Sequence, residues 1–477
     1  MKLKLVMFTV SLIALAKVNA QTNFSGTWNG TLNVAGEIRL VLHVKLLQDG
    51  TYSGTLDSPD QNASGIKCDT VISKEAIGDS TLNFTINNLR VSYTGKLLND
   101  STMSGIFTQG ASFPLDFHRT DIPFVARKIN RPQTPKPPFP YTSEEVAYNG
   151  NGLQYGGTIT IPHGTGTFPA VVLITGSGQQ DRDETIFDHK PFAVLADALT
   201  RDGFIVLRVD DRGIGNSTGN FAASTTADFA KDVNASIEYL KTRKEVNDNK
   251  IGLVGHSEGA MIAPMVASAR KDINFIVLLA APGVKIIDLM AEQNAAVMRS
   301  AGIDSSFSEN YKQVYKDVIT AIMNAPDTNT ARSNAYKIMN NWKVKADTAY
   351  LYKLGFRSEK DYLQYVNERI AAFSTPWFRY FINFDPQPYL TQLKKIKVLA
   401  LNGSKDIQVV SRQNLPAVRS ALVQGRTKTF EVKELPGLNH LFQTCTKCTV
   451  MEYGQLEETI SPMALTTITT WLNNNVK

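Results

Sequence analysis

The chain has 477 residues, with 50 Lys and Arg against 44 Asp and Glu and a formal net charge of +6. Hydrophobic residues make up 43% and charged residues 20%, which is the composition of a globular protein that forms a core. The basic residues are scattered without a run or stripe, which argues against a nucleic-acid-binding function. The length suits two or three domains.

The first twenty residues have the pattern of an export signal. Lys2 and Lys4 precede an apolar run from Leu5 to Ala16, and the segment ends on the small residue Ala20. This order is typical of a secretory signal peptide that is cleaved after Ala20. The run is short for a membrane span, and an uncleaved anchor is the alternative. We therefore expect an exported protein, secreted or periplasmic, with no membrane span after cleavage.

The segment 21–120 has the pattern of a small antiparallel β-domain. In E-I-R-L-V-L-H-V-K-L-L every second residue is apolar and faces one way: Ile38, Leu40, Leu42, Val44 and Leu46. T-L-N-F-T-I and L-R-V-S-Y-T-G-K-L-L behave similarly, and Q-D-G-T-Y supplies turn residues. Short strands with such turns predict a barrel or a sandwich. The segment has no cluster of titratable groups, so we expect a structural or substrate-facing role.

A proline-rich stretch follows and predicts a stiff, extended linker over 121–144. From 145 to 477 the pattern changes to near-continuous apolar strands that alternate with amphipathic helices, as in F-P-A-V-V-L-I-T-G-S-G and K-P-F-A-V-L-A-D-A-L-T-R-D-G. Such strands predict a parallel sheet that is covered on both faces. Helical periods fill 285–376 and interrupt the sheet. An insertion that leaves the carboxyl end of a strand would lie over the ligand site as a lid.

The residues Gly255-His256-Ser257-Glu258-Gly259 match the G-x-S-x-G motif. A predicted strand precedes them and a predicted helix follows, which is the context that this motif requires. The glycines let the chain turn sharply and hold the serine hydroxyl at the top of the sheet. A chance glycine-rich turn is the alternative. A serine hydroxyl is a weak nucleophile unless a base removes its proton, so the chain must also supply a histidine and an acid.

His440 and Asp406 are the best partners for Ser257. His440 follows the last predicted strand, and Asp406 follows the strand before it. The order Ser257, Asp406, His440 is the chain order of α/β-hydrolases. Asp406 would hold the tautomer of His440, which would take the proton of Ser257 and return it to the leaving group. His256 adjoins the nucleophile and is poorly placed as a base, while Asp385 is an alternative acid.

An acyl-transfer site also needs an oxyanion hole. One donor is expected to be the backbone N–H of Glu258, directly after the nucleophile. The other is expected from the loop G-S-G-Q-Q-D-R-D-E, at Ser177, with Gly178 as the alternative. The chain lacks G-x-x-x-x-G-K-[ST] and a strand-linked G-x-G-x-x-G, so we do not expect nucleotide binding.

The roles of several acidic and cysteine residues stay open. Asp210, Asp211 and Arg212 could serve a metal or acid–base site, or form a buried ion-pair turn. The Glu258 side chain could steer substrate charge, or act as a helix N-terminal acid that complements the helix dipole. Two of the three cysteines form the motif C-T-K-C at 445–448. A local disulfide is expected in an oxidising compartment, and two free thiols are the alternative.

Six sequence motifs occur in this order: L-I-T-G-S-G-Q-Q-D-R-D-E, R-V-D-D-R-G-I-G-N-S-T-G, G-L-V-G-H-S-E-G-A-M-I-A-P, T-P-W-F-R-Y-F-I-N-F-D-P, L-A-L-N-G-S-K-D-I-Q-V and L-P-G-L-N-H-L-F-Q. Together they resemble bacterial α/β-hydrolase carboxylesterases related to the serine aminopeptidase and hydrolase group. Many members of this group are exported and carry an N-terminal β-rich domain. The resemblance covers 145–477 and, more loosely, 24–120. It implies an α/β-hydrolase fold, the triad Ser257, Asp406 and His440, and esterase activity on small-molecule esters with short acyl chains.

The resemblance implies neither a metal nor a cofactor, and two further functions remain open. The same triad could serve an amidase or a peptidase, or the fold could be vestigial in a binding protein. A peptidase acting on free N-termini would need lid acids, but Glu292, Glu309 and Glu359 form no cluster in the sequence. Five aromatic residues of the lid region could line an acyl pocket or pack the lid helices: Trp342, Trp377, Phe378, Tyr380 and Phe381.

Overall fold

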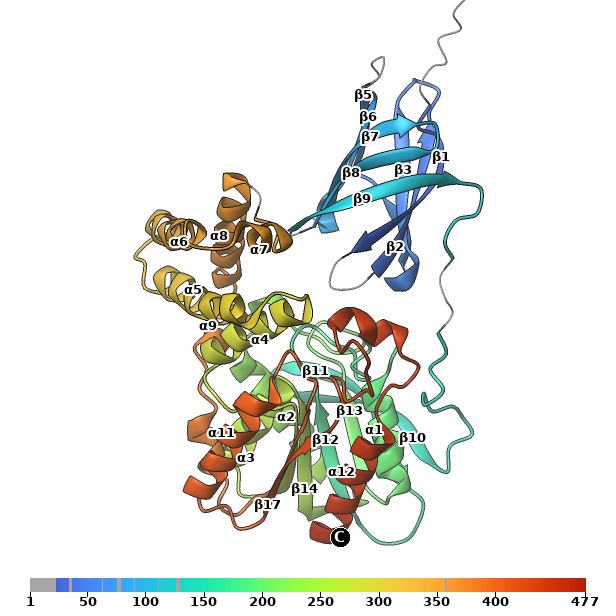
Figure 1. Ribbon diagram of the computed structural model, residues 1–477. Helices are drawn as coiled ribbons and strands as arrows, with labels where there is room; N and C mark the ends of the chain where they lie inside the picture. Colours follow the sequence, from blue (N-terminus) through green and yellow to red (C-terminus); the bar gives the residue numbers. More distant parts are fainter. Residues whose placement is uncertain are drawn as a thin grey trace, which may run out of the picture.

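The computed structural model describes residues 23–33, 37–61, 63–74, 79–89, 91–109, 111–125, 129–356 and 358–477. The predicted signal peptide lies outside the described residues. Two β-sheets organise the chain, one in an N-terminal domain and one in a larger C-terminal domain (Figure 1). Within the described ranges no helix has the length and apolar character needed to cross a membrane.

The N-terminal domain is one antiparallel sheet of nine strands in the order β4-β3-β2-β1-β9-β8-β7-β6-β5. β3 also contacts β5, so the sheet curls back on itself. The strands are β1 (Gly26–Asn33), β2 (Glu37–Leu46), β3 (Tyr52–Ser58), β4 (Ala63–Lys67), β5 (Thr70–Lys74), β6 (Thr81–Ile86), β7 (Val91–Asn99), β8 (Thr102–Gln109) and β9 (Ala111–Thr120). The predicted antiparallel β-rich domain is thereby confirmed.

Alternation along β2 explains how this sheet buries one face. Ile38, Leu40, Leu42 and Val44 are buried, whereas Leu46, at the end of the strand, is 44% exposed. Side chains two residues apart lie on the same face of a strand, so the alternating pattern places the apolar side chains of β2 on the inner face of the sheet. The enclosed core includes aromatic side chains that are fully buried or nearly so, among them Trp28, Phe84, Tyr93 and Phe117.

The C-terminal domain is built on an eight-stranded sheet in the order β10-β11-β13-β12-β14-β15-β16-β17. β10 and β11 run antiparallel to their neighbours, and all pairs from β13 to β17 are parallel. The strands are β10 (Tyr141–Gly150), β11 (Leu153–Pro162), β12 (Phe168–Ile174), β13 (Ile205–Val209), β14 (Val246–His256), β15 (Ile273–Leu279), β16 (Lys397–Gly403) and β17 (Phe430–Leu435). β10 begins at Tyr141, inside the range predicted as linker.

Five helices connect or follow these strands and cover the sheet (Figure 1). They are α1 (Pro191–Arg201), α2 (Thr226–Lys241), α3 (Gly259–Ala269), α11 (Ser411–Gln424) and α12 (Pro462–Asn475). β12 and β15 are almost wholly buried, and β14 is buried from Ile251 to His256, as expected for parallel strands covered on both faces. The predicted α/β fold is confirmed.

A helical insert separates β15 from β16. It comprises α4 (Ile286–Ser300), α5 (Ser305–Met323), α6 (Thr328–Lys343), α7 (Thr348–Lys353), α8 (Glu359–Phe373), α9 (Pro376–Ile382) and α10 (Gln387–Leu390). It therefore continues past residue 376, where the sequence pattern places its end. The insert leaves the chain after β15. Figure 1 shows α4 and α9 beside one end of the sheet, so the insert is placed to cover a site there.

Candidate active site

The predicted sharp turn lies between β14 and α3. Ser257 has φ of 54°, a left-handed conformation that non-glycine residues adopt mostly where the surrounding structure enforces it. It is half-buried, whereas both of its neighbours are buried. A Cβ atom on Gly255 would overlap the carbonyl oxygen of Gly259, and one on Gly259 would overlap that of Ile174. Both glycines of the motif are thus required by close backbone packing that presents the Ser257 side chain.

Gly259→Ala is therefore expected to destabilise the C-terminal domain by about 3 kcal/mol, because a backbone clash cannot be relieved by a change of rotamer. The measurement is the unfolding midpoint in urea. Gly166→Ala is the control: Gly166 has φ of 94° and no neighbouring atom within 4 Å, so alanine there carries only conformational strain, about 1–2 kcal/mol. A Gly259→Ala variant as stable as the parent would contradict this packing.

The structure brings Asp406 and His440 together. Asp406 follows β16 and His440 follows β17, and Nδ1 of His440 lies 2.8 Å from Oδ2 of Asp406. The other carboxylate oxygen accepts the backbone N–H groups of Gln408 at 2.8 Å and Val409 at 2.9 Å. With the Asp406 side chain fully buried and held in this way, Nδ1 of His440 carries the proton and Nε2 keeps the lone pair.

Ser257 and His440 line one cavity of about 300 Å³. Its walls come from the turn after β14, the loops after β12, β16 and β17, and the lid helices α4 and α9. Most of the lid contribution is apolar: Leu289, Met290, Trp377 and Phe381. The Trp377 and Phe381 rings stack with centroids 4.8 Å apart, whereas Trp342 packs against Phe307 and Tyr311 inside the lid. Trp377 and Phe381 are thus the predicted aromatics that reach the cavity.

The loop after β12 lies against the nucleophile. A Cβ atom on Gly176 would lie 3.4 Å from the Cβ of Ser257, and Ser177 lines the same cavity. In the described part of the chain, the backbone N–H groups of Ser177 and Glu258 donate to no other protein group. Two unengaged amides beside a serine are the arrangement that an oxyanion hole requires.

The Glu258 carboxylate is buried and links three elements. It accepts hydrogen bonds from the Thr226 hydroxyl of α2 at 2.6 Å and from the Trp377 indole N–H of α9 at 2.9 Å. Burial raises the pKa of Glu258, although these donors oppose the rise. The sequence left two roles open for this side chain, steering of substrate charge and a helix N-terminal acid. The structure shows a third role, because the side chain links the lid helix α9 to the turn that carries Ser257.

The D-D-R turn after β13 forms ion pairs, but with partners outside the turn. Asp210 pairs with Arg182 at 2.6 Å, and Arg212 pairs with Asp232 at 2.6 Å. Asp211 has no cationic partner among the described residues and accepts the Thr175 hydroxyl at 3.0 Å. Burial raises the pKa of Asp211 to about 7.

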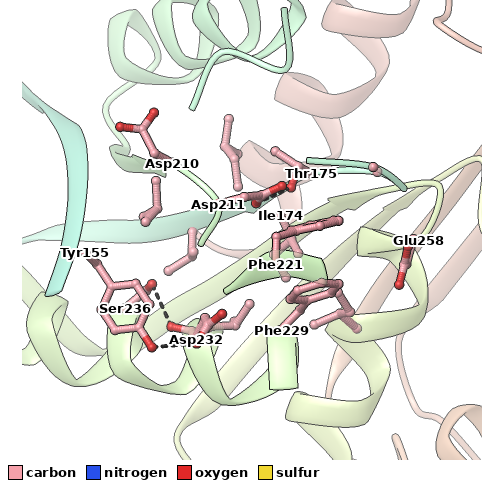
Figure 2. A pocket seen from close by; sticks show the side chains of 17 residues that line it. Tyr155, Ile174, Thr175, Asp210, Asp211, Phe221, Phe229, Asp232, Ser236 and Glu258 are labelled. Carbon is pink, nitrogen blue, oxygen red and sulfur yellow. Dashed lines mark hydrogen bonds between the residues drawn. The ribbon is translucent and has the colours of Figure 1, made fainter. Parts of the chain in front are cut away.

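Asp211 also borders a second, smaller cavity of about 50 Å³ behind the loop that follows β12, which we name the oxyanion loop after its proposed role. Figure 2 shows Asp211 bonded to Thr175 on one side of this cavity, the Tyr155–Asp232 pair on another, and Glu258 at its far end. Glu258 lines both cavities, so this small space lies directly behind the site wall.

The wall beyond His440 is braced by the C-T-K-C motif. Cys445 and Cys448 form a disulfide, and the Glu452 carboxylate accepts backbone N–H groups within that loop. These three residues are the one set of possible metal ligands that the described ranges bring together. With both sulfurs bonded and the carboxylate occupied, the set fits a structural loop. The next segment, Val450–Gln455, contributes Val450 and Tyr453 to the cavity.

Sequence reasoning missed Glu184 and gave His256 no role. Glu184 Oε1 accepts the backbone N–H of Gly176 at 2.7 Å and lies 3.0 Å from Nδ1 of His256. Nε2 of His256 lies 3.0 Å from the carbonyl oxygen of His440. A buried acid in a loop rich in polar residues carries no periodic signal, and its partner lies 72 residues away.

The fold and this site together define an α/β-hydrolase. Residues 189–350 match the family described as Serine aminopeptidase, S33. That segment includes Ser257 and ends before Asp406 and His440. The resemblance to α/β-hydrolases of the serine aminopeptidase-related group, drawn from the motifs, is thereby confirmed.

The chain is 36% identical over 170 residues to esterase EstD of Thermotoga maritima, a match that covers 36% of this chain and 40% of that relative. The chain thus matches less than half of the length of this curated relative. Similar solved structures include the Pyrococcus furiosus esterase Pf2001, at 14% identity and a TM-score of 0.39 over 71% of this chain and 94% of that one. A 2,6-dihydroxy-pseudo-oxynicotine hydrolase has 14% identity and a TM-score of 0.40 over 70% and 68%.

Proposed function

We propose that this protein is a serine carboxylesterase that hydrolyses small carboxylic esters through an acyl-enzyme on Ser257. The observation that carries the proposal is the buried Asp406–His440 pair at the same cavity as a serine held in a left-handed turn. An esterase relative, EstD, supports the ester as substrate class.

In this reaction Ser257 Oγ attacks the ester carbonyl carbon while Nε2 of His440 takes the hydroxyl proton. The negative charge that forms on the carbonyl oxygen is held by the N–H groups of Ser177 and Glu258. The tetrahedral intermediate collapses, the C–O bond to the alcohol breaks, and His440 returns the proton to the departing oxygen. Water, deprotonated by His440, then attacks the acyl-enzyme and releases the acid and the free serine.

The charges around the cavity favour an ester over the free N-terminus of a peptide. Recognition of an ammonium group needs a carboxylate that faces the substrate. Among the described residues, the acids that line the cavity are Glu184 and Glu258, and both already accept hydrogen bonds from protein groups. The lid acid Glu292 is paired with basic side chains, and neither Glu309 nor Glu359 lines the cavity. An aminopeptidase is therefore the less favoured candidate.

The size and lining of the cavity favour short acyl chains. Its volume of about 300 Å³ is at the small end of ligand pockets. Trp377 and Phe381 close its lid side. A long acyl chain would have to displace these rings, so kcat/KM should fall as the chain lengthens.

The test compares p-nitrophenyl esters of two to twelve acyl carbons with aminoacyl p-nitroanilides, using the full chain and Ser257→Ala as the blank. We expect the highest kcat/KM for the shortest esters and no anilide cleavage. Trp377→Ala should move the preference toward longer acyl chains, about tenfold, because it opens the lid side. Trp342→Phe, inside the lid, is the matched control and should leave the length profile unchanged.

Three outcomes would overturn the assignment. Cleavage of anilides without esters would transfer it to a peptidase or an amidase. Ester cleavage that persists in Ser257→Ala would place the chemistry elsewhere, and no turnover of either substrate class by the parent would favour a binding protein.

Export is a separate proposal and depends on residues 1–20. Its supports are the basic start, the apolar run and the small residue Ala20. A disulfide at Cys445–Cys448 also suits an oxidising compartment. Expression of the whole gene in a Gram-negative host, followed by fractionation and N-terminal sequencing, should give a periplasmic chain that starts at Gln21. A cytoplasmic chain that starts at Met1 would exclude it.

A further inference from the structure

Three segments of the active site meet at one buried imidazole ring. His256 belongs to the serine turn, its Nδ1 lies 3.0 Å from Oε1 of Glu184, and its Nε2 lies 3.0 Å from the carbonyl oxygen of His440. The same Glu184 oxygen accepts the N–H of Gly176 in the oxyanion loop at 2.7 Å. The nucleophile, the oxyanion loop and the loop of the catalytic base are thus joined through His256 and Glu184.

The two partners of the ring determine its protonation state. A carboxylate oxygen and a carbonyl oxygen both accept hydrogen bonds and cannot donate them. A neutral imidazole has one N–H and one lone pair, so it would turn its lone pair toward one of the two oxygens. The imidazolium has two N–H groups and satisfies both. The His256 side chain is 9% exposed and that of Glu184 is 6% exposed, so a missing donor at this buried pair would cost free energy.

The backbone supports the view that this contact is built in. Glu184 has φ of 53°, so its side chain reaches the ring from a left-handed conformation. A non-glycine residue in this region costs free energy and persists only where the surroundings enforce it. A buried charge is tolerated when it is paired and hydrogen-bonded, as this one is.

We propose that His256 and Glu184 form a buried imidazolium–carboxylate pair that positions the oxyanion loop and the His440 backbone for catalysis. The inference rests on the proposed function, since it assigns a positioning role within that reaction. It makes neither residue a catalytic group, because each acts through Gly176 or His440. If His256 lost one proton, one of its ring nitrogens would turn a lone pair toward an oxygen that can only accept. The hydrogen bond lost in this way would loosen the loop that carries His440.

The charged groups near the His256 ring favour its protonated form. Burial acts to lower the pKa of His256, but the charge and hydrogen bond of Glu184, the His440 carbonyl and the Asp406 charge raise it, and the net direction is upward. The His440 ring lies with its centroid 4.8 Å from that of His256. On the far side of the oxyanion loop, the buried Asp211 carboxyl interacts with the charges of both Glu184 and Glu258.

The sign of the pH effect follows from this upward shift. The interaction is fully present below the pKa of an unfolded histidine, about 6.5, and is lost as the pH rises through the raised pKa of the folded state. Deprotonation of His256 then governs loss of activity on the alkaline side.

Glu184→Gln tests the proposal, since it keeps an oxygen for Gly176 and removes the charge. We expect kcat to fall about 10- to 100-fold at alkaline pH with little change in KM, and the alkaline limb to move to lower pH. Glu292→Gln is the matched control, because Glu292 is a buried, ion-paired carboxylate in the lid. It should leave the pH profile unchanged. A loss of the same factor at every pH in Glu184→Gln would mean a structural role only.

A second readout needs no ester substrate. In the full chain labelled with ¹⁵N-histidine, His256→Gln assigns the His256 signal among the six histidines. We expect both ring nitrogens of His256 to remain protonated at a pH where an ordinary histidine has lost its proton, and this state to be lost in Glu184→Gln. A neutral His256 at that pH in the parent overturns the proposal.

The rate at which a fluorophosphonate modifies Ser257 separates the two proposals. That rate depends on the nucleophile, the base and the oxyanion hole, and not on the natural substrate. If the parent is modified rapidly and Glu184→Gln slowly above pH 8, the positioning role holds even where no ester is cleaved. If both are modified at one rate across the pH range, the positioning role is wrong and the esterase proposal is untouched.

Discussion

Ser257→Ala is expected to lower kcat for ester hydrolysis by about 10⁶-fold, and His440→Ala by a similar factor. Both residues act in the same step, because the serine attacks only as His440 removes its proton. The double variant should therefore be no slower than either single variant by more than a few fold. The measurement is kcat with a short p-nitrophenyl ester at neutral pH.

A residual acceleration over water should survive in all three variants, because the Ser177 and Glu258 amides and the cavity remain in place. His163→Ala provides the control, since His163 is exposed and does not line the cavity. If the effects of Ser257→Ala and His440→Ala multiply, the two residues do not form one catalytic unit.

The residues of the proposed triad could be selected from the sequence because each lies at a recognisable position in the chain. Ser257 follows an apolar strand and opens a helix, and Asp406 and His440 each follow a strand. Parallel strands bring their carboxyl ends to one edge of the sheet, so residues far apart in sequence converge there. The structure adds the 2.8 Å contact between Asp406 and His440 and the left-handed backbone of Ser257.

The contacts that hold the loops of the site in place could not be predicted in the same way. Glu258 reaches Trp377 across 119 residues, and Glu184 reaches His256 across 72. Both acids lie in short loops or at a helix start, where neither periodicity nor a spacing rule applies. The sequence discounted His256 as a base because it adjoins the nucleophile. That same adjacency lets its ring reach the His440 backbone, a contact that only the assembled loops reveal.

Lid and nucleophile are coupled in this arrangement. The Trp377 indole donates to a carboxylate whose own backbone N–H is the proposed oxyanion donor. A lid helix that moves would thus break a hydrogen bond to the residue next to Ser257 and leave a buried acid with one donor fewer. The cavity wall at α9 and the proposed oxyanion donor at Glu258 therefore depend on the same hydrogen bond.

Asp406→Asn is expected to lower kcat by about 10⁴-fold while the fold stays intact. Oδ1 of Asp406 accepts the N–H groups of Gln408 and Val409, so an asparagine would keep its oxygen there and turn its NH₂ group toward His440. Nδ1 of His440 would then have to accept a hydrogen bond, and the proton would move to Nε2. His440 would then have no lone pair facing Ser257 and could not act as the base.

The measurement is kcat against pH, with Asp385→Asn as the matched control. Asp385 lies in the insert between α9 and α10 and accepts the backbone N–H of Gln387 at 3.0 Å, outside the cavity. Its variant should keep the activity of the parent within about twofold. If Asp385→Asn loses activity and Asp406→Asn does not, the acid of the triad is misassigned, and the 2.8 Å contact to His440 serves only the packing of two loops.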